Sequence, residues 1–173
     1  MLHQSKARIM ELFFEEPNRD FQIREVSRLS GLAVTSVKKH LDELVEEGLL
    51  RKNDKTLYPS FVAEYTNPLF VLYKKYVIIV KILESGVLDY IEKEIYPSCI
   101  VLFGSVSKGE YQKSSDIDLF IQAGKKDLNI TAFEKKLKHE IHLIFEADLK
   151  KLSPELLNNI INGDVVSGYL KIK

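Results

Sequence analysis

Apolar positions in the first sixty residues recur at helical spacing and then give way to two short runs. The spacing predicts three helices, over residues 5–16, 23–30 and 33–47. Each is followed by a residue that stops helices, namely Pro17, Gly31 and Gly48. The positions expected to face a common core are Ile9, Leu12, Phe13, Val26, Leu29, Val34, Val37, Leu41 and Leu44. The runs 49–52 and 57–60 flank the polar stretch 53–56 and predict a β-hairpin.

Three short helices, with a glycine turn before the third and a hairpin after it, resemble the winged helix-turn-helix family. The run EVSRLSGLAVTSVKKHLDELVEEGLLRK carries the resemblance, which covers about the first third of the chain. In that family the third helix enters the major groove of DNA and the wing contacts phosphates. The resemblance implies double-stranded DNA as a partner. The implied contacts are Thr35, Ser36, Lys38 and Lys39 on the third helix and Arg51, Lys52 and Lys55 on the wing.

The acidic C-terminal half of the third helix leaves a second interpretation open. It carries Asp42, Glu43, Glu46 and Glu47, and residues 1–60 hold ten Lys or Arg and ten Asp or Glu. A domain without net charge has no general attraction to nucleic acid. A docking or dimerisation module is therefore the alternative to a DNA-binding domain.

A long apolar segment connects the two halves of the chain. Asn67 and Pro68 suit the cap and the first position of a helix, which the pattern continues to about Leu83. Its apolar residues cover more than one stripe, so the helix must be buried on several sides. It either packs between the domains and contributes to a homodimer interface, or is buried within one chain. Lys74, Lys75 and Lys81 argue against a membrane span.

After Ser85 and Gly86 the pattern alternates between helices and short strands. It predicts helices over 87–95, 130–139 and 153–163. Strands are predicted over 99–103, 116–121 and 141–145, with a polar loop over 106–115. Asp116 and Asp118 are two apart on one strand, so both carboxylates face the same way. Such a pair can hold Mg²⁺, which takes one or two protein carboxylates and completes its coordination with water and phosphate oxygens.

The Gly104–Ser105 turn directly after a buried strand suits a phosphate ligand, because glycine lets the backbone approach closely and serine offers a hydroxyl. The stretch LFGSVSKGEYQKSSDIDLFI, with ten residues between Ser105 and Asp116, resembles the minimal nucleotidyltransferases of the DNA polymerase-beta superfamily. The resemblance covers about residues 85–173. It implies an NTP donor (ATP is expected), Mg²⁺ with Mn²⁺ as the alternative, and transfer of a nucleoside monophosphate to an acceptor. It implies Asp116 and Asp118 as metal ligands and Gly104, Ser105, Lys108 and Ser115 as nucleotide contacts.

Two departures from the family pattern concern catalysis. The family has a third carboxylate on the next strand, where this chain has His142; imidazole can act as a base but is a poor Mg²⁺ ligand. Glu140 lies on the same strand face if the strand extends that far and is then the candidate substitute, so Glu140 and His142 are both candidate catalytic residues. Members of the family often have arginines after Gly-Ser, and this chain has Val106 and Lys108 in such places. Lysine neutralises a phosphate as a point charge, whereas the planar guanidinium of arginine can donate two parallel hydrogen bonds to it.

Composition narrows the class of protein. The chain has 173 residues, 25 Lys or Arg balancing 25 Asp or Glu, and a single cysteine, Cys99. A DNA partner must therefore meet a local basic patch, and an internal disulfide or a cysteine-based zinc site is excluded. No signal peptide is recognisable, and we expect a cytoplasmic protein.

Together the patterns predict an α+β protein: a winged helix-turn-helix domain over 1–62, a connecting helix over 63–84 and a minimal nucleotidyltransferase domain over 85–173. The expected function is DNA binding combined with Mg-NTP binding and nucleotidyl transfer. One alternative is a transcriptional regulator whose catalytically degenerate nucleotidyltransferase domain senses nucleotides or dimerises. Another is an antitoxin-type enzyme that modifies a partner protein.

Overall fold

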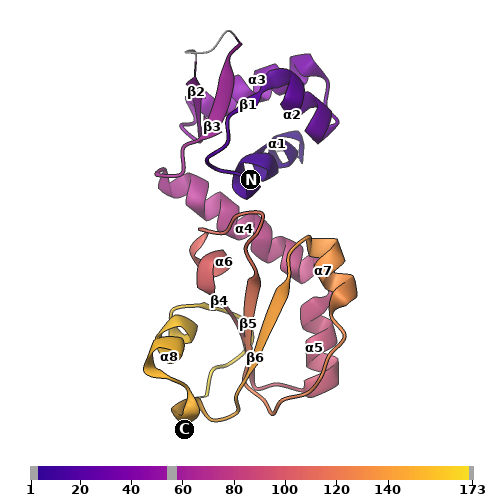
Figure 1. Ribbon diagram of the computed structural model, residues 1–173, viewed down its shortest axis with the longest axis vertical. Coiled ribbons are helices and arrows are strands. Elements are labelled where there is room, and N and C mark those ends of the chain that lie inside the picture. Colours follow the sequence, from indigo (N-terminus) through magenta and orange to yellow (C-terminus); the bar gives the residue numbers. More distant parts are fainter. Residues whose placement is uncertain (1–3, 54–57, 172–173) are drawn as a thin grey trace. The chain divides into compact units, whose positions relative to one another are not determined.

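The computed structural model describes residues 4–53 and 58–171, and it confirms the α+β class (Figure 1). The chain divides into two compact units, residues 1–74 and 75–173, each described by itself below. The division falls within the long helix α4 (Pro68–Ser85). Asn67 caps this helix, since its side-chain oxygen accepts a hydrogen bond of 2.9 Å from the Leu69 amide.

The first unit is a three-helix domain with a small antiparallel sheet. Its elements are α1 (Gln4–Glu15), β1 (Phe21–Gln22), α2 (Ile23–Ser30), α3 (Val34–Glu46), β2 (Leu50–Asn53) and β3 (Ser60–Ala63). The strands lie in the order β1-β3-β2. Phe13 and Phe21 meet edge to face in the core, with ring centroids 5.0 Å apart. Gly31 (φ 71°) makes the left-handed turn that ends α2 before α3 begins.

Three details of the first unit differ from the sequence prediction. Of the predicted second wing strand 57–60, residue 57 lies outside the described residues, and the observed strand β3 begins at Ser60 and continues through the buried residues Phe61 and Ala63. Strand β1 was not predicted; it is only two residues long and exists through its pairing with β3. Leu29 and Val34, expected in the core, are 49% and 47% exposed; Leu29 follows the buried Val26 near the end of α2, and Val34 precedes the buried Val37 at the start of α3.

The second unit contains a four-stranded mixed sheet with helices on both sides (Figure 1). Its elements after α4 are α5 (Val87–Ile95), β4 (Cys99–Phe103), α6 (Gly104–Lys108), β5 (Ile117–Ile121), α7 (Thr131–Leu137), β6 (Ile141–Phe145), a 3-10 turn (Leu149–Lys151), α8 (Pro154–Ile161) and β7 (Asp164–Gly168). The strand order is β6-β5-β4-β7. Among the strand pairs that the described residues form in this sheet, β5–β6 is parallel, and β4–β5 and β4–β7 are antiparallel.

The sheet has two covered faces. Cys99, Val101, Phe103 and Phe120 form one core with Ile160 of α8. On the other side, α5 and α7 lie together through the rings of Tyr90 and Phe133, whose centroids are 5.3 Å apart (Figure 1). Since side chains alternate along a strand, Asp118 shares the face of Phe120 and Phe103. The carboxylate therefore stands at the open end of the face that α8 covers.

Four predicted features of the second unit need correction. The stretch 106–115 is not all loop, because α6 occupies 104–108 and buries Val106. The strand predicted from residue 116 begins at Ile117. The helix predicted over 130–139 ends at Leu137, where Lys138 takes a left-handed conformation (φ 61°). Strand β7, which pairs with β4, was not predicted. Just before it, the backbone at Gly163 lies so close to β4 that a Cβ there would be 2.5 Å from the Leu102 carbonyl oxygen, so only glycine allows this close approach.

Helix α4 is not buried on all sides within one chain, contrary to one of the two interpretations of its sequence. Leu69, Leu72, Tyr76 and Leu83 are each more than half exposed. Phe70, Ile78 and Ile82 are buried, and so is the charged Lys74, with 2% of its surface exposed. Among the described residues, no helix is both long and apolar enough to cross a membrane.

Candidate functional site

The Gly104 turn and the Asp118 carboxylate are packed directly against each other. Phe103, the last residue of β4, pairs with Asp118 of β5. Gly104 follows with φ +75°, and a Cβ at this position would lie 2.4 Å from Oδ2 of Asp118. Only glycine satisfies both the left-handed backbone and the lack of space. The structure thus brings the Gly-Ser turn and the Asp-x-Asp strand, fourteen residues apart in sequence, to one place.

The residues after Gly104 form the short helix α6 and not an open loop. The Ser107 hydroxyl donates a hydrogen bond of 3.0 Å to the Gly104 carbonyl, which closes the turn. Gly109 (φ 71°) ends the helix. As a result Ser105 is half-buried beside the turn, and Lys108 is exposed on the last turn of the helix.

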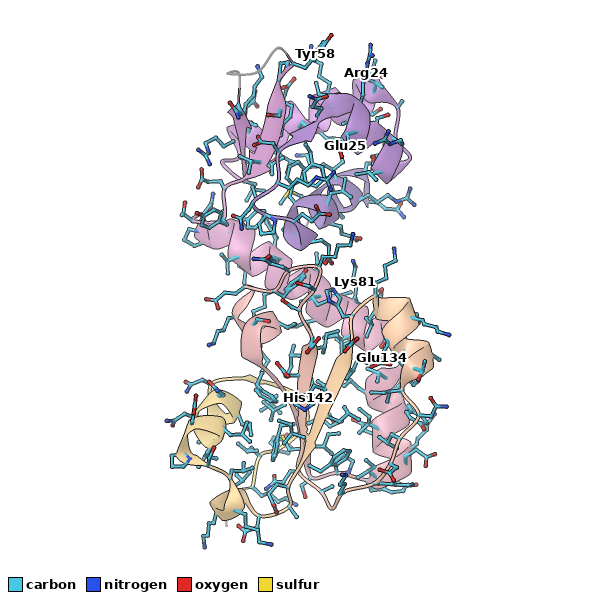
Figure 2. The ribbon with its side chains drawn as sticks, in the orientation of Figure 1. Arg24, Glu25, Tyr58, Lys81, Glu134 and His142 are labelled. Carbon is cyan, nitrogen blue, oxygen red and sulfur yellow. The ribbon has the colours of Figure 1, made fainter. Side chains whose placement is uncertain are left out.

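The parallel pairing of β5 and β6 aligns two rows of polar side chains. Asp118 pairs with His142, and His142 Nδ1 lies 3.3 Å from Asp118 Oδ1. At the start of β5, the Ile117 amide donates a 2.9 Å hydrogen bond to the carbonyl of Glu140, the residue before β6. This places Glu140 next to Asp116, one step ahead of the His142–Asp118 pair. Figure 2 labels His142 on β6; its side chain is 62% exposed, against 26% for Asp118.

A pocket of about 570 Å³, lined by polar and charged residues, lies on the Asp116 and Glu140 side of this arrangement. Its lining residues are Lys113, Ser114, Ser115, Asp116, Glu134, Lys135, Lys138, His139 and Glu140. Asp118, His142 and Lys108 are not among them. The predicted site residues therefore fall into two neighbouring groups, which Asp116, just before β5, and Asp118, on β5, connect.

The predicted nucleotide contact Ser115 has a local structural partner. Its hydroxyl oxygen accepts a hydrogen bond of 2.9 Å from the Gln112 amide. Nearby, the three lysines of α7 and its cap have different surroundings. Lys135 and Lys138 line the pocket, whereas Lys136 donates to the carbonyls of Glu84 and Ser85 at 2.8 and 3.2 Å.

His139 is a residue of this site that the sequence pattern did not identify. It is 5% exposed, and its Nδ1 lies 2.7 Å from the Ser115 carbonyl oxygen. Its ring also meets the buried ring of Tyr111 edge to face at 5.8 Å. The contact with Ser115 depends on the register between β5 and β6, which no local pattern encodes, so the sequence offered no signal for it.

The donor atoms of the site suit a hard divalent cation. Mg²⁺ needs only one or two protein carboxylates, which Asp116 and Asp118 can supply. Within 4–53 and 58–171, no three His, Cys, Asp or Glu side chains are grouped to hold a metal by themselves. The fit therefore relies on the two aspartates together with water and ligand oxygens. Burial raises the pKa of the Cys99 thiol, which keeps it in the inert protonated form.

The exposed face of α3 carries the predicted base-edge contacts. Thr35, Ser36, Lys38 and Lys39 are all exposed, while Val37 between them is buried. On β2, Arg51 and Lys52 are exposed, with Arg51 Nε 3.5 Å from Oε2 of Glu64. The predicted wing contact Lys55 lies outside the described residues.

Acidic residues in the C-terminal half of α3 form ion pairs with α1. Lys6 of α1 pairs with Glu43 at 2.9 Å and with Glu47 at 2.7 Å. These ion pairs raise the pKa of Lys6 and, with His40, lower the pKa of Glu43. Lys6 thus pairs with two of the four acidic groups, and its single positive charge offsets one of their two negative charges.

Comparison with known families agrees with both halves of this description. The helix-turn-helix domain of the IclR type matches residues 7–54. The polymerase beta nucleotidyltransferase family matches residues 86–168, which include the Gly104 turn, Asp116 and Asp118. No curated protein matches the chain significantly. The chain therefore joins an N-terminal helix-turn-helix domain to a C-terminal nucleotidyltransferase domain of the polymerase beta family.

Proposed function

We propose that the protein binds duplex DNA through α3 and the wing, and that its second domain transfers a nucleoside monophosphate from an NTP to an acceptor. The observation that carries the second part is the contact between Gly104 and Asp118. A turn with no room for a side chain, pressed against a strand carboxylate, suits a triphosphate held beside a divalent cation. Asp116 and Asp118 would hold Mg²⁺ or Mn²⁺, and the cation would neutralise phosphate charge and align the leaving pyrophosphate.

The chain's own groups have distinct roles in the proposed transfer. Gly104, Ser105 and Lys108 bind the triphosphate, with ATP the expected donor. The acceptor hydroxyl oxygen forms a bond to the α-phosphorus, the bond from that phosphorus to the bridging oxygen breaks, and pyrophosphate leaves. The acceptor proton passes to a carboxylate or imidazole base. Glu140 is the better placed of the two candidates, since it lines the pocket beside Asp116 while His142 contacts Asp118.

A pyrophosphate-release assay tests the transfer. The protein is supplied with each of the four NTPs, with Mg²⁺ or Mn²⁺, and with cell extract as a source of acceptors. We expect release with at least one NTP, lost in Asp116→Asn/Asp118→Asn. Glu140→Gln should lower the rate by about 10²-fold or more, whereas His142→Gln should lower it less. Equal release by the wild type and the double variant would contradict the proposal.

A second candidate function rests on the contact between His142 and Asp118. The imidazole occupies the place of a third carboxylate and lies 3.3 Å from an oxygen that would ligate metal. A site altered in this way suits a nucleotide sensor that controls DNA binding. Its signature would be NTP binding without pyrophosphate release, together with DNA affinity that changes when NTP is added. An antitoxin-type transfer to a partner protein would instead appear as label from α-labelled NTP on a polypeptide in the extract.

We also infer a homodimer formed through α4. Leu69, Leu72, Tyr76 and Leu83 are exposed at spacings of three, four and seven, so they lie along one side of the helix as in a coiled-coil seam. Two copies of this seam would bury each other's apolar side chains. A helix-turn-helix protein gains from such pairing because two half-sites on DNA are then bound together.

A further inference from the structure

His139 has surroundings that are unusual for a histidine on a polar pocket wall. It follows the left-handed cap Lys138 and precedes strand β6, so it is held at the junction between a helix and a strand. Only 5% of its surface is exposed, and Tyr111, against which its ring packs, is 1% exposed. The ring is therefore fixed in plane and position by the core.

The hydrogen bond of His139 reaches the backbone beside Asp116. Its Nδ1 lies 2.7 Å from the Ser115 carbonyl oxygen, and since a carbonyl only accepts, the hydrogen must be on Nδ1. On the other side of Asp116, the Ile117 amide donates to the Glu140 carbonyl at 2.9 Å. Residues 139 and 140 thus hold residues 115 and 117.

Asp116 depends on these two contacts for its position. The paired residues of β5 and β6 begin with Ile117 and Ile141, so Asp116 lies just outside the ladder, and it is exposed. A carboxylate in such a place would otherwise sample many positions. Two backbone anchors, one on each side, restrict its Cα and hence the direction of its side chain.

We propose that His139 is a positioning residue, which orients Asp116 for metal binding through the Ser115 carbonyl. The proposal deepens the function proposed above and rests on it for the identity of the ligand. The anchoring itself belongs to the protein without ligand. Removing a group that orients a metal ligand without touching the metal commonly lowers the metal affinity by about 10- to 100-fold.

Three substitutions separate positioning from simple core packing. His139→Asn keeps an N–H donor close to the place of Nδ1. His139→Gln carries its amide further from the main chain, nearer the place of Nε2, and His139→Leu has no donor. All three remove the ring contact with Tyr111, so a role in packing alone would treat the asparagine and glutamine variants alike.

The experiment combines Mn²⁺ titration with amide hydrogen exchange on the full-length chain. We expect His139→Asn to bind Mn²⁺ within about threefold of the wild type, and His139→Gln and His139→Leu to bind at least about tenfold more weakly. Without metal, exchange of the Ile117 amide should be faster in the glutamine and leucine variants, while β4 amides stay protected.

Several results would overturn the proposal. Equal Mn²⁺ affinity in the asparagine and glutamine variants would do so, as would an Ile117 amide that exchanges equally in both. If His139→Leu fails to fold, the asparagine–glutamine pair still decides the question. Failure of the wild type to bind Mn²⁺ would count against the proposed donor site. The exchange rate of the Ile117 amide would then still test whether His139 anchors the backbone beside Asp116.

Discussion

Replacing Gly104 with alanine tests the contact that defines the proposed donor site. The new Cβ would lie 2.4 Å from Asp118 Oδ2, whereas ordinary contacts begin near 3.4 Å, so the carboxylate must move by about 1 Å. Alanine at φ +75° also strains the backbone, at a cost of about 1–2 kcal/mol. Because a metal ligand displaced by this distance no longer fits the cation, we expect Mg-NTP affinity to fall by at least about tenfold.

The strain and the collision can be separated with a matched control. Gly31 has a similar φ of +71°, but an added Cβ there would meet nothing within 4 Å. Gly31→Ala should therefore lose the same 1–2 kcal/mol of free energy of unfolding, roughly, and keep its Mg-NTP affinity. Chemical denaturation measures the free energy, and calorimetric titration measures the affinity. Unchanged Mg-NTP affinity in Gly104→Ala would refute the reasoning, because the carboxylate would then not depend on the space beside Gly104.

Three further predictions concern other parts of the chain. Burial lowers the pKa of Lys74 to about 8, partly opposed by Glu15, so the unfolded state binds more protons above that pH. The free energy of unfolding should rise by up to about 3 kcal/mol between pH 8 and 10.5, and Lys74→Met should lack this rise in denaturation at each pH. Leu72→Glu should weaken the α4 dimer more than about a hundredfold in light scattering, and the control Leu29→Glu, at a similarly exposed leucine, should not. Lys38→Ala/Lys39→Ala should reduce the salt dependence of DNA binding by about two in log–log slope, while Lys125→Ala leaves it unchanged.

Features that depend on residues close together in the sequence were predicted correctly. Strands 99–103 and 141–145 and helix 87–95 were predicted with the bounds that the structure has. The roles of the Gly104 turn and the two aspartates stay predictions, which rest on a short motif in the sequence. Each of these features combines local apolar runs with residues that stop or cap an element.

Features that depend on distant parts of the chain were missed. Strand β7 forms because Gly163 lets it lie beside β4, and helix α6 forms because Val106 finds a place in the core. Leu29 and Val34 fit the helical spacing of the core positions but are exposed, because exposure depends on which other elements cover a helix face and spacing alone does not show that. His139 meets Ser115 only through the register of β5 and β6.

Calorimetric titration with the four NTPs, first in Mg²⁺ and then in Mn²⁺, is the most direct test of the central claim, because it needs no knowledge of the acceptor. Wild type and Asp116→Asn/Asp118→Asn are compared at equal protein concentration, with the helix-turn-helix domain present in both. We expect metal-dependent binding of at least one NTP, ATP first among them, that the double variant loses. Absence of binding for every NTP in both metals, or binding that survives the loss of both carboxylates, would contradict it.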